Sequence, residues 1–264
     1  MKSREFKDHF SQQSQDYALF RPHYPDTLGK ILAKLSPSTK LALDVGCGSG
    51  QFSEVLAHYF DQIIAIDASS EQIAQAKPHP KIQYLHALAE NIPLADQSTD
   101  LISVAQAAHW LDLDKFYAEV RRIAKSNAIL ALISYGVFSI DEEHLNHYFR
   151  HFYEVTIAPY WAPERRHVDE GYKNLPFPFQ EISVQPPVLQ VEWNFYQLIG
   201  YMSTWSAVKA ATQALGHNPL NVLADALLPE WEDPELPRVV SWPLSLRVGR
   251  INPDKGMVSC PEID

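Results

Sequence analysis

Short apolar runs alternate with segments of helical spacing over the first half of the chain. The runs predict buried strands at residues 40–45, 63–67, 81–87, 100–107 and 128–136. Apolar residues three and four apart predict helices at 26–35, 51–60, 69–77 and 113–125. Strands that alternate with helices predict a doubly wound α/β fold, with a parallel sheet between two layers of helices.

Three side chains near the starts of these helices are candidate caps, and an acid lies near the start of a further helix. Asp26 is the expected N-cap of the first helix, Ser69 or Ser70 that of the third, and Asp114 lies near the start of the fourth. Their short side chains carry oxygens that accept hydrogen bonds from the open N–H groups of a first helical turn.

The alternation ends after Gly136. Residues 141–158 have helical spacing, and 159–187 are rich in proline and aromatic residues. A strand at 189–195, helices at 196–215 and 219–228, and a last strand at 243–251 follow. We therefore predict one structural unit in two parts. Residues 1–136 form the α/β core with an N-terminal lid, and 137–264 form a helical and aromatic cap plus final strands that complete the sheet.

Composition narrows the class of protein. The 264 residues carry a formal net charge of -10, which argues against a nucleic-acid partner, because basic charge supplies most non-specific nucleic-acid affinity. No apolar segment approaches the ~18 residues of a membrane helix, and the N-terminus has no apolar secretory core. Cys47 and Cys260 form no metal-ligand spacing. We expect a cytoplasmic protein that acts on a small molecule, without a metal or membrane partner.

Glycines interrupt the chain directly after the first predicted strand, at Gly46, Gly48 and Gly50. A glycine turn between a strand and a helix is typical of nucleotide-like ligands, which bind near the helix N-terminus. The third glycine comes one residue too early for a dinucleotide fingerprint, so a nicotinamide-dependent oxidoreductase is a weaker alternative. Asp67 ends the next strand, where an acid can accept hydrogen bonds from ribose hydroxyls; capping the following helix is the alternative.

Three stretches carry a resemblance to a known family: LDVGCGSGQ, IIAIDASSEQI and HALAENIPLADQSTDLISVAQAAHW. The chain resembles the class I S-adenosylmethionine-dependent methyltransferases of the type 11 group, and its layout is similar to the trans-aconitate methyltransferase-like branch. The resemblance implies a Rossmann-like, mostly parallel seven-stranded sheet. It also implies S-adenosylmethionine as cofactor and S-adenosylhomocysteine as product.

The resemblance also implies cofactor-binding roles. The backbone of Gly46 and Gly48 lies against the methionine part, and Asp44 fixes its ammonium group directly or through water. Asp67 holds the ribose hydroxyls, and Gln106 faces the sulfonium. The other implied contacts are Cys47, Gly50 and Gln51 in the loop, Ala68, Leu88, Ala89 and Glu90 around the adenine, and Tyr17 and Arg21 in the N-terminal lid.

Two departures from the family pattern bear on stability and affinity. Leu88 stands where many relatives carry an acid that receives the adenine amino group, so packing and backbone hold the adenine here. The usual Pro-Gly-Gly turn is replaced by a stretch with Ser126 and Asn127. Asparagine tolerates left-handed geometry, so this turn can be retained.

The candidate catalytic residues are His109 and Trp110, which follow the fourth strand. Trp110 would wall the pocket, and His109 would orient the acceptor or take a proton; a packed His-Trp pair is the structural alternative. A carboxylate acceptor needs no general base, whereas a hydroxyl or amine gains from one. The pair Arg165-Arg166, beside aromatic residues, suits an anionic acceptor. We therefore expect O-methylation of a carboxylate. The alternatives are methylation of a hydroxyl or amine with His109 as base, and a non-catalytic cofactor-binding protein.

Overall fold

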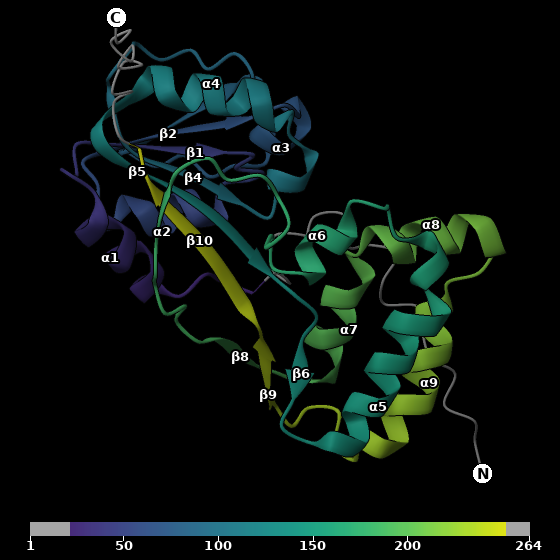
Figure 1. Cartoon of the computed structure of the whole chain (residues 1–264). Coiled ribbons are helices and arrows are strands. Elements are labelled where there is room, and N and C mark those ends of the chain that lie inside the picture. Colours follow the sequence, from purple (N-terminus) through teal and green to yellow (C-terminus); the bar gives the residue numbers. More distant parts are fainter. Residues whose placement is uncertain (1–21, 252–264) are drawn as a thin grey trace, which may run out of the picture. The chain divides into compact units, whose positions relative to one another are not determined.

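The computed structural model describes residues 22–251 and divides them into two compact units (Figure 1). The larger unit contains His23–Val137, Glu164–Leu189 and the segment from Pro243, and the smaller contains Phe138–Pro163 and Gln190–Trp242. The segment at 164–189, which we assigned to the cap, thus belongs to the larger unit. The predicted lid residues Tyr17 and Arg21 lie outside the described residues.

The larger unit is built on a seven-stranded sheet of order β3-β2-β1-β4-β5-β10-β7. The first five strands of this order pair in parallel, and β10 pairs antiparallel with both β5 and β7. The mostly parallel, Rossmann-like sheet predicted from the sequence is confirmed, including a late strand that completes it. The strands are β1 (Leu41–Val45), β2 (Gln62–Asp67), β3 (Ile82–His86), β4 (Thr99–Ala105), β5 (Ala124–Tyr135), β7 (Gln180–Ile182) and β10 (Leu244–Arg250).

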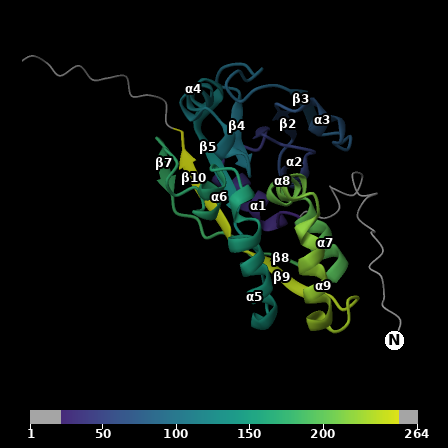
Figure 2. The ribbon, with the colours of Figure 1, turned by 90° about the vertical axis from the view of Figure 1, so that its right-hand side faces the viewer.

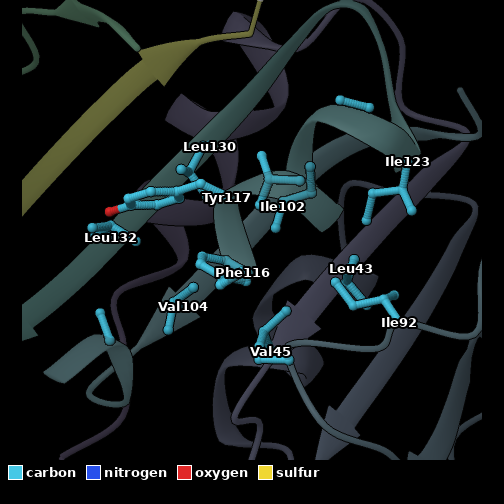
Figure 3. Close-up of a cluster of buried hydrophobic side chains, with 14 of the residues drawn as sticks. Leu43, Val45, Ile92, Ile102, Val104, Phe116, Tyr117, Ile123, Leu130 and Leu132 are labelled. Carbon is cyan, nitrogen blue, oxygen red and sulfur yellow. The ribbon is translucent and has the colours of Figure 1, made fainter. Parts of the chain in front are cut away.

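Helices cover both faces of this sheet because successive strand residues point to opposite sides. Ala42 belongs to the buried cluster that contains α1 and α2, whereas its neighbour Leu43 belongs to the cluster that contains α4. Figure 3 shows Phe116 and Tyr117 of α4 beside the strand residues of the second cluster. The helical elements of this unit are α1 (Asp26–Leu35), α2 (Gln51–Ala57), α3 (Ser70–Ala74), η1 (Ala108–Trp110), α4 (Leu113–Ile123) and α6 (Arg165–Asp169).

The caps agree with the sequence in part. The Ser69 side chain accepts a hydrogen bond from Gln72 N at the start of α3, as predicted. The prediction that Asp26 is an N-cap is wrong, because α1 begins at Asp26 after Pro25 and the Asp26 carboxylate binds His58 and Tyr59. Asn127 has φ 63°, so it adopts the left-handed geometry expected for the altered turn.

The smaller unit holds a three-stranded sheet of order β6-β9-β8 and helices that contact one another. Figure 2 shows α7 and α9 side by side, and these two helices are in contact. The predicted helix at 196–215 is two helices that meet at Thr204-Trp205. The elements are β6 (Ser139–Ile140), α5 (Glu143–His151), η2 (Phe152–Thr156), η3 (Ala158–Tyr160), β8 (Leu189–Trp193), α7 (Phe195–Ser203), α8 (Ser206–Leu215), α9 (Pro219–Trp231) and β9 (Arg238–Trp242).

Aromatic side chains form the core of the smaller unit. Trp242 donates a hydrogen bond from Nε1 to the Tyr201 hydroxyl over 3.1 Å, and its ring packs on Trp193 and Phe138. Trp205 packs against Phe138 and Tyr201. Trp205 and Trp242 thus both contribute to this core. No helix in the described part of the chain is long and apolar enough to cross a membrane.

Candidate functional site

The glycine loop lies at the point where the strand order of the sheet reverses. β1 is flanked by β2 on one side and β4 on the other, and ligands of open α/β sheets bind beyond the carboxyl ends of strands at such a point. Gly46, Gly48 and Gly50 follow β1 with φ of 65°, 57° and 94°. Cys47 N donates to Ile66 O of β2 over 3.0 Å, which holds the loop against the neighbouring strand. Gln51 then begins α2.

The three glycines are required for different reasons. A Cβ on Gly46 would lie 2.5 Å from the Cβ of Ala107, and one on Gly50 would collide with the Tyr84 ring and hydroxyl. A Cβ on Gly48 would instead meet no described atom closer than 3.7 Å. The backbone of Gly48 is therefore open on that side, as a loop that receives a ligand must be.

The Asp67 carboxylate joins the ends of β1 and β2. Oδ2 accepts a hydrogen bond from Gly48 N and Oδ1 accepts one from Ser69 N, both over 2.8 Å. A carboxylate has about four acceptor positions, so these two bonds leave capacity for a pair of ribose hydroxyls. Because Ser69 already caps α3, helix capping alone does not explain the acid, and ribose binding stays the prediction for Asp67.

Asp44 is fully buried within β1 and both of its oxygens are occupied. Ser53 Oγ donates to Oδ2 over 2.6 Å, and Ser103 Oγ donates to Oδ1 over 2.9 Å. Burial raises the pKa of Asp44 to about 6, against the lowering effect of the two hydroxyls. This carboxylate joins β1, α2 and β4 beneath the glycine loop. Its predicted contact with the cofactor ammonium stays a prediction.

The pKa of Asp44 predicts a pH dependence of stability. The folded-state pKa of about 6 lies above the ordinary value of 3.8, so the folded protein binds this proton more tightly than the unfolded chain. The stability that this proton contributes is present below about pH 4 and is lost as pH rises through about pH 6, a loss on the order of 3 kcal/mol. Urea unfolding should show this loss in the wild type but not in Asp44→Asn, whose side chain stays neutral. Parallel pH curves for the two proteins would contradict the assignment.

The residues predicted to surround the adenine lie at the ends of β2 and β3. Ala68 O accepts from His86 Nε2 over 3.0 Å, and Glu90 Oε1 accepts from Asp112 N over 3.0 Å. Ala89 is 6% exposed, whereas Leu88 is 55% exposed. Glu90 thus links this loop to the start of α4, and the Leu88 side chain is available to pack on a ligand. Their adenine contacts stay predictions.

Gln106 follows β4 beside the glycine loop and has a strained backbone, with φ 58°. Its Nε2 donates to Tyr135 O over 3.0 Å, while its Oε1 is buried without a hydrogen-bond partner among the described residues. A buried acceptor without a donor is destabilising by about 1–3 kcal/mol. The free Oε1 therefore suits a donor group of a ligand bound at this edge.

The two predicted catalytic residues lie in η1, directly after β4. Trp110 is 61% exposed and its ring lies 4.7 Å from that of His109, centroid to centroid. His109 is half-buried, and its Nδ1 lies 2.9 Å from the Tyr172 hydroxyl. Burial lowers the pKa of His109 to about 4, with further lowering by Arg165 and His167. His109 is therefore neutral near neutral pH.

Two residues that sequence reasoning missed lie beside His109. Tyr172 is 0% exposed, and His167 on α6 has a buried Nδ1 with no hydrogen-bond partner among the described residues. The sequence carried one signal, a glycine directly before Tyr172, but nothing that paired residues 63 positions apart. Among the described residues, no group of three His, Cys, Asp or Glu side chains is arranged to hold a metal ion.

The residues at this edge fit the cofactor that the family resemblance implies. The open backbone at Gly48 admits a ligand, the Asp67 carboxylate has spare acceptor positions, and the buried Gln106 Oε1 lacks a donor.

Cys47 is buried and burial raises the pKa of its thiol, so this residue serves the loop by packing rather than by reactivity.

Known proteins match both the sequence and the fold. A family profile described as a methyltransferase domain matches residues 43–132. A candidate methyltransferase of Dictyostelium discoideum is 36% identical over 228 residues, which are 85% of this chain and 86% of the relative. The solved structure of a candidate type II methyltransferase from Anaeromyxobacter dehalogenans is 42% identical. It covers 88% of this chain and 99% of its own, with a TM-score of 0.83.

Two further relatives each match slightly less than half of this chain. A candidate S-adenosylmethionine-dependent methyltransferase of Saccharomyces cerevisiae is 30% identical over 132 residues, 47% of this chain and 45% of the relative. The malonyl-[acyl-carrier protein] O-methyltransferase of Pectobacterium atrosepticum is 33% identical over 120 residues, 44% of this chain and 47% of the relative. The chain therefore matches about half the length of each of these two proteins.

Proposed function

Because the chain belongs to the S-adenosylmethionine-dependent methyltransferases, we propose that it methylates a carboxylate oxygen of a small anionic molecule. From the sequence resemblance, we also propose that it belongs to the trans-aconitate methyltransferase-like branch of the family. When bound, S-adenosylmethionine supplies an electrophilic methyl group, and transfer to a carboxylate gives a methyl ester and S-adenosylhomocysteine without release of a proton.

The observation that carries this proposal is the chemistry around His109. Its pKa of about 4 makes the imidazole a weak base for a hydroxyl or an amine, whose protons are held far more tightly. Arg165 contributes a positive charge close enough to lower that pKa. A neutral imidazole and a guanidinium suit an acceptor that is already anionic. The malonyl O-methyltransferase relative, which matches less than half of this chain, points in the same direction.

The product of the reaction tests the proposal. The protein is incubated with methyl-labelled S-adenosylmethionine and a panel of small acids that includes trans-aconitic, citric, malonic and succinic acid, together with hydroxylated and amine acceptors of similar size. We expect label in an acid product that mild alkali releases as methanol, because esters hydrolyse in alkali whereas methyl ethers and methylamines do not. An alkali-stable product would replace the carboxylate by a hydroxyl or amine.

Two adjacent arginines provide a matched control. Arg165 acts on His109, whereas the side chain of Arg166 is exposed and does not contribute to the His109 pKa. In Arg165→Gln, we expect the KM for the acid to rise roughly tenfold, the scale of one charge-assisted hydrogen bond. In Arg166→Gln, the KM stays at the wild-type value. An equal KM in both variants would show that the acid is not bound beside His109.

A further inference from the structure

We infer that Tyr172 is a positioning residue that holds His109 in the Nε2–H tautomer, so that His109 presents a hydrogen-bond donor to the acceptor carboxylate. This inference rests on the proposed function for the identity of the acceptor. The tautomer itself does not depend on that function. The contact between His109 and Tyr172 could not be predicted from residue type or sequence spacing, because Tyr172 lies 63 positions after His109.

The direction of the hydrogen bond follows from the chemistry of its two partners. The Tyr172 hydroxyl lies 2.9 Å from His109 Nδ1. A phenol O–H is a stronger acid than a neutral imidazole N–H, so the phenol donates and the imidazole nitrogen accepts. Burial raises the pKa of the Tyr172 hydroxyl, so the phenol keeps its proton and can donate it to Nδ1. An imidazole that accepts at Nδ1 carries its proton at Nε2.

The backbone fixes Tyr172 for this contact. Gly171 and Tyr172 have φ of 64° and 61°, and a left-handed conformation is an outlier for a bulky aromatic residue. A Cβ on Gly171 would collide with Ser245 of β10, so the turn is pressed against the sheet. Tyr172 itself is completely buried. Strain of this kind persists where the surrounding structure determines it, and such sites cluster where function needs a fixed geometry.

The surroundings of His109 favour an anion at its second nitrogen. Arg165 and His167 act on the imidazole from α6, and α6 contacts η1. His167 is near enough to act on the His109 imidazole, and its own Nδ1 is buried without a hydrogen-bond partner among the described residues. A neutral Nε2–H donor beside a guanidinium orients a carboxylate oxygen. It cannot remove a proton from an acceptor, because its lone pair at Nδ1 is occupied.

Nitrogen-15 NMR of His109 in the full-length protein tests the inference without any acceptor. We expect the wild type to show one neutral tautomer, with the proton on Nε2 and a hydrogen-bonded Nδ1. In Tyr172→Phe, the Nδ1 signal should move to that of a free lone pair, and the pKa of His109 should rise because the neutral form loses its donor. A proton on Nδ1 in the wild type, or signals unchanged in Tyr172→Phe, would overturn the assignment.

Kinetics then test the donor role. With the best acid of the panel, we expect Tyr172→Phe to raise the KM roughly tenfold and to change kcat less. Tyr117→Phe is the matched control, because Tyr117 is also buried, and its hydroxyl donates to Pro176 O over 2.6 Å. An unchanged KM in Tyr172→Phe, or an equal rise in Tyr117→Phe, would overturn the donor role. If no acid is methylated by either protein, the proposed function fails, whereas the NMR result still decides the tautomer.

Discussion

Replacing Gly48 by alanine is expected to weaken binding of S-adenosylhomocysteine roughly 10- to 100-fold. This is the loss of affinity expected when an extra methyl group is forced into a closely packed contact. A Cβ at this position meets no described atom closer than 3.7 Å, the Oε1 of Gln72. The new methyl group therefore points into open space beside the loop, where the cofactor is proposed to lie against the backbone. Isothermal titration calorimetry of wild type and variant measures the loss.

Gly216 supplies the matched control for this prediction. It has φ 73° at the end of α8, and its Cβ would meet no described atom within 4 Å. Alanine at either Gly48 or Gly216 has to adopt a left-handed conformation, which costs about 1–2 kcal/mol of folding free energy. Both variants should therefore lose similar stability. Gly216→Ala should bind the ligand as the wild type does. Wild-type affinity in Gly48→Ala would show that the cofactor does not contact Gly48, and equal losses in both variants would attribute the effect to stability.

The cofactor-binding core was predictable because its signals are local. The apolar run that ends at Val45, the glycines after it and the acid at Asp67 each occupy a few consecutive positions, and together they define a strand, a turn and the end of the next strand. Ser69 illustrates the same point, since a cap is decided within one helical turn. The prediction at Asp26 was wrong because Pro25 occupies the N-cap position and Asp26 is the first residue of α1, which leaves the Asp26 carboxylate to bind His58 and Tyr59 just after α2.

The surroundings of His109, where the acceptor is proposed to bind, could not be predicted in the same detail, because contacts between residues far apart in the sequence determine them. The segment at 164–189 has no clear hydrophobic period, and its proline and aromatic residues indicated a cap. It instead belongs to the larger unit, where β7 pairs with β10 and α6 contacts η1. This arrangement brings Tyr172 to His109. No spacing rule links positions so far apart. Residue type alone suggested His109 as a base, whereas burial, with a smaller effect of Arg165 and His167, lowers its pKa and makes it a weak one.

Asp67→Ala is expected to weaken binding of S-adenosylhomocysteine by about 1–3 kcal/mol, the scale of hydrogen bonds to a charged group. Two causes could produce this loss. The carboxylate holds the glycine loop through Gly48 N over 2.8 Å, and it is predicted to accept hydrogen bonds from the ribose hydroxyls. Asp67→Asn is a milder change, because one amide oxygen still accepts from the backbone. Calorimetric titration of wild type and both variants gives the overall size of the effect.

A ligand that lacks one ribose hydroxyl separates these causes. The 2′-deoxy analogue of S-adenosylhomocysteine removes the group that Asp67 is proposed to bind and leaves the loop unchanged, so protein and ligand changes form a double-mutant cycle. If Asp67 binds the ribose, the wild type should lose affinity for the analogue, while Asp67→Ala should bind both ligands about equally. If Asp67 acts only through Gly48, the alanine variant should lose the same factor for both ligands, and the cycle should show no coupling. That second result would reject the ribose assignment and leave Asp67 as the residue that shapes the loop.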